Sequence, residues 1–222
     1  IKAEYGKEIM LSKRAIIFDF DGTLADSLKA WEKVDVRFFS KRNLKYDQQD
    51  YFNAIMGLSL QSTAEYTINK YQLKENPQDI INEWHNDYDH MFKNEITLFP
   101  YVEEFLLKLT ELNIPFGIAT AGPQKMMQLF DRYPKIKHAI GAFVSCDDVK
   151  VNKPDPAVYL ECAKRLGVDI KDCCIVEDTL VGLQGARAAG CDVILALTDL
   201  KKKEQKIELC DGYFQEYKEL ID

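Results

Sequence analysis

Five short apolar runs constrain the fold of this chain more than any other feature of its sequence. The runs are uninterrupted rather than alternating, and Ile, Val and Phe are frequent in them. A strand without a polar face is typical of a parallel sheet that helices cover on both sides. The candidate strands are AIIFDF (15–20), IPFGIAT (114–120), GAFVS (141–145), DCCIVED (172–178) and DVILAL (192–197).

Helical patterns separate the later candidate strands from one another. Apolar residues recur at helical spacing in YVEEFLLKLTEL (101–112), and Tyr159 and Cys162 share a stripe that ends at Gly167. The run TLVGLQGARAAG (179–190) is rich in small residues, as in a helix packed closely on a sheet. This alternation predicts an α/β fold with a doubly wound, Rossmann-like parallel sheet.

The segment 28–94 shows no convincing strand pattern and is expected to be helical. We therefore expect a core domain formed by residues 1–25 and 97–222, with an all-helical domain, 26–96, inserted between its first two strands. The helical signals are Leu28, Trp31, Val34 and Phe38, then SLQSTAEYTINKYQL (59–73), then Ile81, Trp84, Tyr88 and Phe92.

Composition and charge limit the classes of partner. The 222 residues are 46% hydrophobic, which is enough apolar material for a substantial core. With 29 basic and 36 acidic residues the net charge is −7, so we expect neither nucleic acid nor a membrane as partner. No apolar run approaches the ~20 residues that span a bilayer. The six cysteines form no CxxC pair, and a cytoplasmic protein with reduced thiols is expected. The oligomeric state stays open, with a monomer as one possibility.

Two aspartates stand where the first candidate strand ends, in FDFDGTLADS (18–27). Residues i and i+2 of an extended strand point the same way, so Asp19 and Asp21 are predicted to face one space. Ligands of open parallel sheets bind beyond the carboxyl ends of the strands. Gly22 permits a tight turn there. The alternative is a strand-terminal turn in which Asp21 caps the next helix.

Three further strand ends carry polar groups. Thr120 lies in ATAG (119–122), Lys153 lies in VNKPDP (151–156), and Glu177 and Asp178 end the fourth apolar run. Each has an ordinary alternative: a strand-end threonine, a solvated surface lysine, and a helix N-cap formed by Asp178. Four polar strand ends in one chain favour a functional site over coincidence.

Together these residues resemble the four motifs of the haloacid dehalogenase-like (HAD) hydrolase superfamily. The motifs are DFDGT at 19–23, Thr120 after an apolar strand, Lys153 in NKPDP, and EDTLVG at 177–182, in that family's order. The helical insertion and GARAAG (185–190) resemble its phosphoglycolate phosphatase-like and β-phosphoglucomutase-like subgroup, which has a helical cap.

The resemblance implies phosphoryl transfer through a covalent aspartyl phosphate. Asp19 would be the nucleophile, and Asp21 would be the general acid that later acts as the base. Thr120, the Ala121 N–H and Lys153 would bind the transferring phosphoryl group.

The resemblance also implies a magnesium ion. The Asp19 carboxylate, the backbone carbonyl of Asp21 and Asp178 would hold Mg²⁺, with Glu177 bound directly or through water. The expected activity is Mg²⁺-dependent hydrolysis of a small-molecule phosphate monoester.

Other functions compete with this interpretation. A phosphosugar mutase of the β-phosphoglucomutase type is the main alternative, but Trp31 stands where such relatives carry a His. MGLSLQS (56–62), our candidate for substrate contact, also lacks the Arg that they use. A response-regulator receiver would carry its aspartate near the third strand, without a helical insertion. A binding protein that lost activity would not need every motif residue intact.

Overall fold

The computed structural model describes residues 6–27, 29–55, 58, 60–196 and 201–221. The chain divides into two compact units, one formed by residues 1–27 with 96–222 and the other by residues 28–95. The domain boundaries expected from the sequence were 25/26 and 96/97. The first unit is called the core unit below, and the second is called the helical unit.

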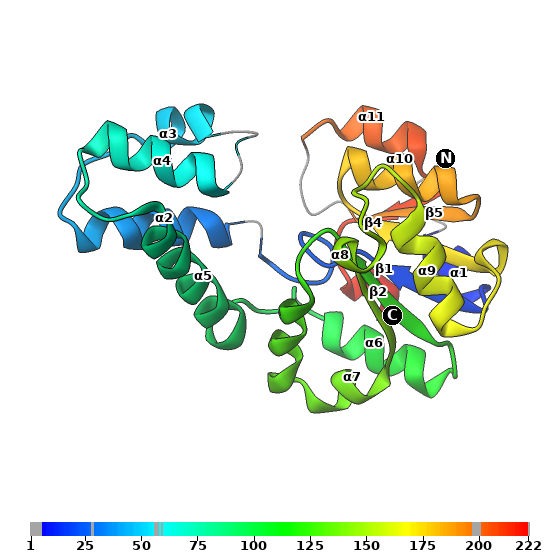
Figure 1. Ribbon diagram of the computed structural model, residues 1–222. Coiled ribbons are helices and arrows are strands. Elements are labelled where there is room, and N and C mark those ends of the chain that lie inside the picture. Colours follow the sequence, from blue (N-terminus) through cyan, green and yellow to red (C-terminus); the bar gives the residue numbers. More distant parts are fainter. Residues whose placement is uncertain (1–5, 28, 56–57, 59, 197–200, 222) are drawn as a thin grey trace. The chain divides into compact units, whose positions relative to one another are not determined.

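A six-stranded parallel sheet in the order β3-β2-β1-β4-β5-β6 forms the centre of the core unit (Figure 1). The predicted α/β fold with a doubly wound parallel sheet is therefore confirmed. β6 was not predicted, because three residues at a sheet edge give too short an apolar run to recognise. The strands are β1 (Ala15–Phe18), β2 (Phe116–Thr120), β3 (Ile140–Ser145), β4 (Cys173–Glu177), β5 (Asp192–Ala196) and β6 (Gly212–Phe214).

Helices cover both faces of this sheet (Figure 1). The helices of the core unit are α1 (Gly6–Leu11), α6 (Val102–Glu111), the 3-10 helix η1 (Gln124–Arg132), α7 (Pro134–Ala139), α8 (Cys146–Val149), α9 (Ala157–Leu166), η2 (Ile170–Asp172), α10 (Leu180–Ala189), α11 (Lys203–Leu209) and α12 (Lys218–Ile221). On one face Phe18 packs edge-on against Phe105 of α6 and against Phe116, with ring centroids 6.3 Å apart in both pairs. On the other face Tyr159 of α9 joins a buried cluster with Ile17. The uninterrupted apolar strands are thus buried on both faces, as their sequences indicated.

Local sequence signals set the ends of α9 and α10. Gly167 follows α9 with φ of +70° and Gly190 follows α10 with φ of +85°, the left-handed conformation that glycine adopts without strain. The N-cap of α10 is Thr179, whose hydroxyl accepts a hydrogen bond from the N–H of Gly182. The alternative in which Asp178 caps this helix is therefore wrong, and the Asp178 carboxylate is left for another role.

The helical unit contains α2 (Ala30–Lys41), α3 (Gln48–Ile55), α4 (Leu60–Tyr71) and α5 (Pro77–Asn94). Its described residues form no strand, as predicted, although α3 was not recognised in the sequence. Phe39 is the centre of an aromatic cluster and stacks on Tyr46 with ring centroids 4.0 Å apart. Arg42 ties the unit together through ion pairs with Glu75 at 2.9 Å and Glu83 at 2.7 Å. Aromatic packing and ion pairs thus connect its four helices.

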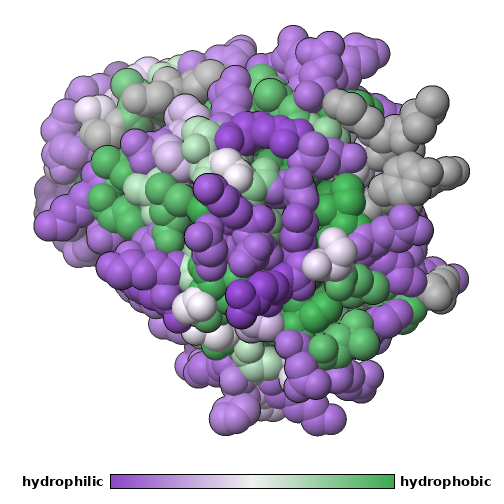
Figure 2. All heavy atoms as spheres, turned by 90° about the vertical axis from the view of Figure 1, so that its right-hand side faces the viewer, coloured by the Kyte–Doolittle hydropathy of each residue, from purple (hydrophilic) through white to green (hydrophobic). Residues whose placement is uncertain are grey.

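Figure 2 shows one face on which hydrophilic residues separate the hydrophobic ones into several groups. Within the described ranges, no helix combines the length and apolarity that a bilayer-spanning segment requires. The six cysteines are all buried and free: Cys146, Cys162, Cys173, Cys174, Cys191 and Cys210.

Candidate active site

The carboxyl ends of three neighbouring strands bring the predicted polar residues together. β1 lies between β2 and β4, and the strand order changes direction there. Such a switch point leaves a crevice for ligands beyond the carboxyl ends. Asp19 directly follows β1, Thr120 ends β2, Glu177 ends β4 and Asp178 follows it. Residues far apart in the sequence therefore share one edge of the sheet.

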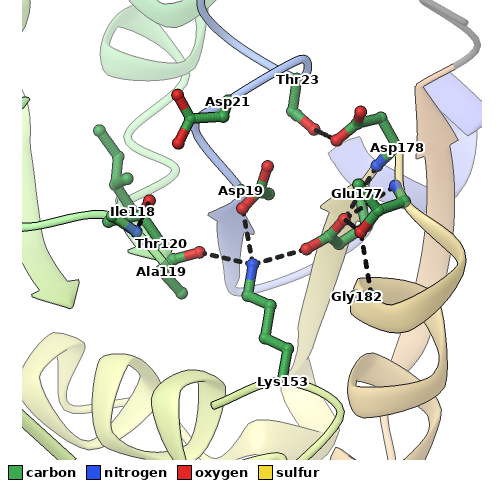
Figure 3. Close-up of polar contacts among 12 residues, drawn as sticks. Asp19, Asp21, Thr23, Ile118, Ala119, Thr120, Lys153, Glu177, Asp178 and Gly182 are labelled. Atoms are coloured by element: carbon green, nitrogen blue, oxygen red, sulfur yellow. Dashed lines mark hydrogen bonds and ion pairs between the residues drawn. The ribbon is translucent and has the colours of Figure 1, made fainter. Parts of the chain in front are cut away.

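Lys153 reaches this edge from the loop before α9, and its ammonium lies between two carboxylates (Figure 3). Nζ donates to Oδ1 of Asp19 at 2.6 Å, to Oε1 of Glu177 at 2.6 Å and to the carbonyl of Ala119 at 3.1 Å. The lysine side chain is only 7% exposed, so it is not the solvated surface lysine of the alternative. Burial alone lowers the pKa of Lys153, but Asp19 and Glu177 outweigh it and hold that pKa well above its usual value. The lysine is therefore a fixed cation.

The pKa values of the two carboxyl groups that share this lysine are shifted in opposite directions. Burial, and then the charge of Glu177, raise the pKa of Asp19 well above its usual value, with Lys153 opposing. Burial also raises the pKa of Glu177, but Lys153 and hydrogen bonds from Thr179 and Tyr159 outweigh it and lower that pKa overall. Glu177 is thus the ionised partner of the lysine. A further positive charge beside Asp19 would favour its ionised form.

Asp178 completes a group of three buried carboxyls. One oxygen each of Asp19, Glu177 and Asp178 lies within 4.8 Å of the others. Thr23 donates its hydroxyl to Oδ1 of Asp178 at 2.9 Å, and burial together with the charge of Glu177 raises the pKa of Asp178 to about 7. Lys153 pairs with two of these three carboxyls, and the charges of Lys206 and Lys153 offset only part of the rise in the pKa of Asp178. These hard oxygen donors fit a divalent cation.

The Asp21 side chain is not part of this group of three. Gly22 turns the chain after it with φ of +82°, and its N–H donates to the carbonyl of Ala25 at 2.9 Å. The buried hydroxyl of Ser27 donates to Oδ1 of Asp21. Burial raises the pKa of Asp21, although Ser27 and Lys153 oppose the shift. Asp21 starts no helix, and its raised pKa suits a carboxyl that carries a proton.

The turn after β2 is fixed from both sides. The fully buried Thr120 accepts a hydrogen bond at Oγ1 from the N–H of Gly122 at 3.0 Å. Ser145, at the end of β3, donates its hydroxyl to the carbonyl of Gly122 at 2.6 Å. Ala121 between them is exposed. Ala121 is thus an exposed residue of a fixed turn that directly follows β2, a neighbour of β1 in the sheet.

Comparison with known proteins identifies the family. Residues 16–196 match the haloacid dehalogenase-like hydrolase family. The chain belongs to this family. The suspected resemblance is thereby confirmed, over most of the chain.

Two relatives of this HAD hydrolase are named as phosphatases. It is similar to fructose-1-phosphate phosphatase YqaB of Escherichia coli, with 30% identity over 183 residues, covering 81% of this chain and 94% of the relative. It is also similar to hexitol phosphatase B of Escherichia coli, with 24% identity over 202 residues, covering 89% of each chain.

A solved structure agrees with the fold. A candidate β-phosphoglucomutase from Thermotoga maritima superposes with a TM-score of 0.80 at 24% identity, covering 93% of this chain and 96% of that one. At this identity the likeness concerns the fold alone.

Three residues at the site of this HAD hydrolase were missed in the sequence. Thr23 was quoted in its motif without a role, and it meets Asp178 across a separation of 155 residues. From the sequence alone, Ser27 is an ordinary polar residue of a loop, and Tyr159 is recognisable only as part of the apolar stripe of a helix. Met56, Gly57 and Ser59, from the segment considered for substrate contact, lie outside the described residues.

Proposed function

We propose that this HAD hydrolase cleaves small-molecule phosphate monoesters, with sugar phosphates as the substrate class, through an aspartyl phosphate on Asp19. The observation that carries the proposal is the contact between the Lys153 ammonium and Asp19 Oδ1, at 2.6 Å, in a buried group of carboxyls. A carboxylate that attacks a phosphate dianion must overcome charge repulsion. A fixed cation next to the attacking oxygen reduces that repulsion.

In the first half-reaction Asp19 is the nucleophile. Its carboxylate oxygen forms a bond to phosphorus while the ester P–O bond breaks, and the electron pair of that bond stays on the leaving oxygen. Asp21 gives its proton to this oxygen, which departs as an alcohol. The raised pKa of Asp21 supports the acid role, because burial favours the protonated form of this carboxyl.

In the second half-reaction Asp21 is the base. Its carboxylate takes a proton from water, and the water oxygen attacks phosphorus as the bond to Asp19 breaks. The products are inorganic phosphate and the free carboxylate of Asp19. Lys153, Thr120 and the N–H of Ala121 would bind the phosphoryl oxygens throughout and stabilise their charge.

A magnesium ion fits the chemistry of the donor set. Asp19, Asp178 and the backbone carbonyl of Asp21 would hold it, with Glu177 bound directly or through water. When bound, the ion would neutralise charge on the phosphoryl oxygens. It would also keep Asp19 ionised, while Asp21 stays free to carry its proton.

The relatives support the proposed substrate class. The named activities of the two phosphatases from Escherichia coli concern fructose 1-phosphate and hexitols. The free, buried thiols of this chain support a reducing compartment, and we propose the cytoplasm. For the mutase alternative, Trp31 stands at the position where a His is expected, and it stacks on Tyr88 with ring centroids 4.6 Å apart. This arrangement favours simple hydrolysis.

The test is phosphate release from a panel of esters that includes fructose 1-phosphate, hexitol phosphates and 6-phosphogluconate. We expect release with Mg²⁺, none with EDTA, and a loss of about a thousandfold in Asp19→Asn. A panel that stays unhydrolysed with Mg²⁺, or an Asp19→Asn variant of full activity, would contradict the proposal. Isomerised product from a sugar phosphate primed with a sugar bisphosphate would favour the mutase.

A further inference from the structure

Tyr159 is a fully buried tyrosine that contacts both members of the Lys153–Glu177 ion pair. Its hydroxyl donates to Oε1 of Glu177 at 2.8 Å and lies 3.1 Å from the carbonyl of Gly182. The face of its ring lies below the Lys153 ammonium, with Nζ 5.0 Å from the ring centroid. One side chain therefore provides a hydrogen bond to the carboxylate and a cation–π contact to the ammonium.

Two glycines of α10 make room for this arrangement. A Cβ on Gly182 would lie 2.0 Å from the carboxyl carbon of Glu177, and a Cβ on Gly185 would lie 3.2 Å from Cε2 of Tyr159. Gly182 and Gly185 are therefore part of the wall against which Glu177 and Tyr159 pack. The absence of side chains at these two glycines leaves the space that Glu177 and Tyr159 occupy.

The oxygens of Glu177 are already engaged by donors of the protein. Oε1 accepts from Lys153 at 2.6 Å and from Tyr159 at 2.8 Å. Oε2 accepts from the N–H of Asp178 at 3.0 Å and from the N–H and hydroxyl of Thr179, both at 3.1 Å. A carboxylate has about four lone-pair sites. These five donors fill them, so Glu177 is held in one orientation.

We infer that Tyr159 is a positioning residue. Its hydroxyl orients the Glu177 carboxylate, and Glu177 in turn holds the Lys153 ammonium against Asp19 and the incoming phosphoryl group. Glu177 then acts as the anchor of Lys153, whereas Asp19, Asp178 and the carbonyl of Asp21 would be the direct ligands of a bound magnesium ion. Tyr159 touches no reacting atom. It affects the reaction only by fixing the position of the Lys153 ammonium relative to Asp19.

This inference rests on the proposed function, and Tyr159→Phe tests it because the variant keeps the ring and removes only the hydroxyl. The matched control is Tyr51→Phe in the helical unit, which removes another buried hydroxyl, bonded to Thr67 at 2.8 Å. We expect kcat to fall about tenfold in Tyr159→Phe with KM within about twofold, as for loss of one hydrogen bond to a charged group. Tyr51→Phe should leave both constants unchanged.

A second readout does not depend on activity. The ammonium protons of Lys153 are followed by ¹H–¹⁵N correlation NMR of protein labelled with ¹⁵N-lysine, with the signal assigned by its absence in Lys153→Met. We expect their exchange with water to be about fivefold faster in Tyr159→Phe than in the wild type or in Tyr51→Phe, because the anchor is loosened.

The activity and the ammonium exchange rate together distinguish a failure of the proposed function from a failure of the role inferred for Tyr159. If the wild type hydrolyses no ester, the proposed function fails, and the exchange rates alone decide whether Tyr159 positions the lysine. Unchanged exchange in Tyr159→Phe overturns the inference. If the wild type is active, an unchanged kcat in Tyr159→Phe also overturns the inference. A melting temperature that falls equally in both variants, with no change specific to Tyr159→Phe, also overturns it.

Discussion

The ammonium of Lys153 lies 2.6 Å from Oδ1 of Asp19, so the proposed phosphate-binding cation is paired with the proposed nucleophile before any substrate is bound. Both side chains are buried, at 7% and 8% exposure, and water screens their interaction little. The same lysine neutralises Glu177. One cation therefore serves two carboxylates, and this shortage of positive charge underlies the first prediction.

Replacing Lys153 with Met should destabilise the metal-free core unit by about 3 kcal/mol, because two buried carboxyls lose their partner. Mg²⁺ should restore part of this stability, since it supplies the missing charge. Urea unfolding in EDTA and in Mg²⁺ measures both effects. The control is Lys164→Met, whose side chain is 81% exposed. Equal stability of Lys153→Met and the wild type in EDTA would refute the prediction.

Replacing Ser27 with Ala should shift the pH dependence of turnover. The Ser27 hydroxyl donates to Asp21 and lowers its pKa, so its removal raises that pKa further. If Asp21 is the general acid, the alkaline limb of kcat should move up by about one pH unit. The kcat–pH profile measures this shift, and Ser12→Ala, at an exposed hydroxyl, is the control. An unmoved alkaline limb would remove the proposed link between Ser27 and the acid.

Replacing Asp35 with Asn should stabilise the helical unit above neutral pH. Burial, and then the charge of Glu32, raise the pKa of Asp35 from 3.8 to about 7. The folded unit therefore binds this proton more tightly than the unfolded chain. Its contribution to stability is fully present below pH 3.8 and is lost as the pH rises through about 7.

The Asp35→Asn variant should accordingly exceed the wild type by about 2 kcal/mol at pH 8 and match it near pH 4. Thermal unfolding at the two pH values gives the comparison. Asp50→Asn, at an exposed position of α3, is the control. A gain that is the same at both pH values would show that titration of Asp35 is not its cause.

Replacing Gly182 with Ala should destabilise the core unit by about 2 kcal/mol, although Ala is normally the better helix residue. The added Cβ would lie 2.0 Å from the carboxyl carbon of Glu177, which has to move. Gly167→Ala provides the contrast, because nothing lies within 4 Å of its Cβ and only the positive φ resists. Urea unfolding of both variants decides, and a stabilised Gly182→Ala would show that Glu177 relaxes freely.

The sequence by itself determined the parallel sheet and the residues at its carboxyl edge. Uninterrupted apolar strands such as 15–18 and 173–177 can be buried only if helices cover both faces, so composition and periodicity predict the layers. Asp19, Thr120 and Asp178 were predicted to meet because parallel strands bring their carboxyl ends to one edge.

Only the tertiary structure decided which of these groups touch. The contacts from Lys153 to Asp19 and Glu177 join residues 134 and 24 positions apart, and the hydroxyl of Tyr159 adds its bond to Glu177 from 18 positions away. No local pattern encodes such distances, because a helical stripe reports burial and not the partner of a buried hydroxyl. Edge strands and short helices such as β6 and α3 also escaped prediction, since their stability comes from neighbours and not from their own few residues.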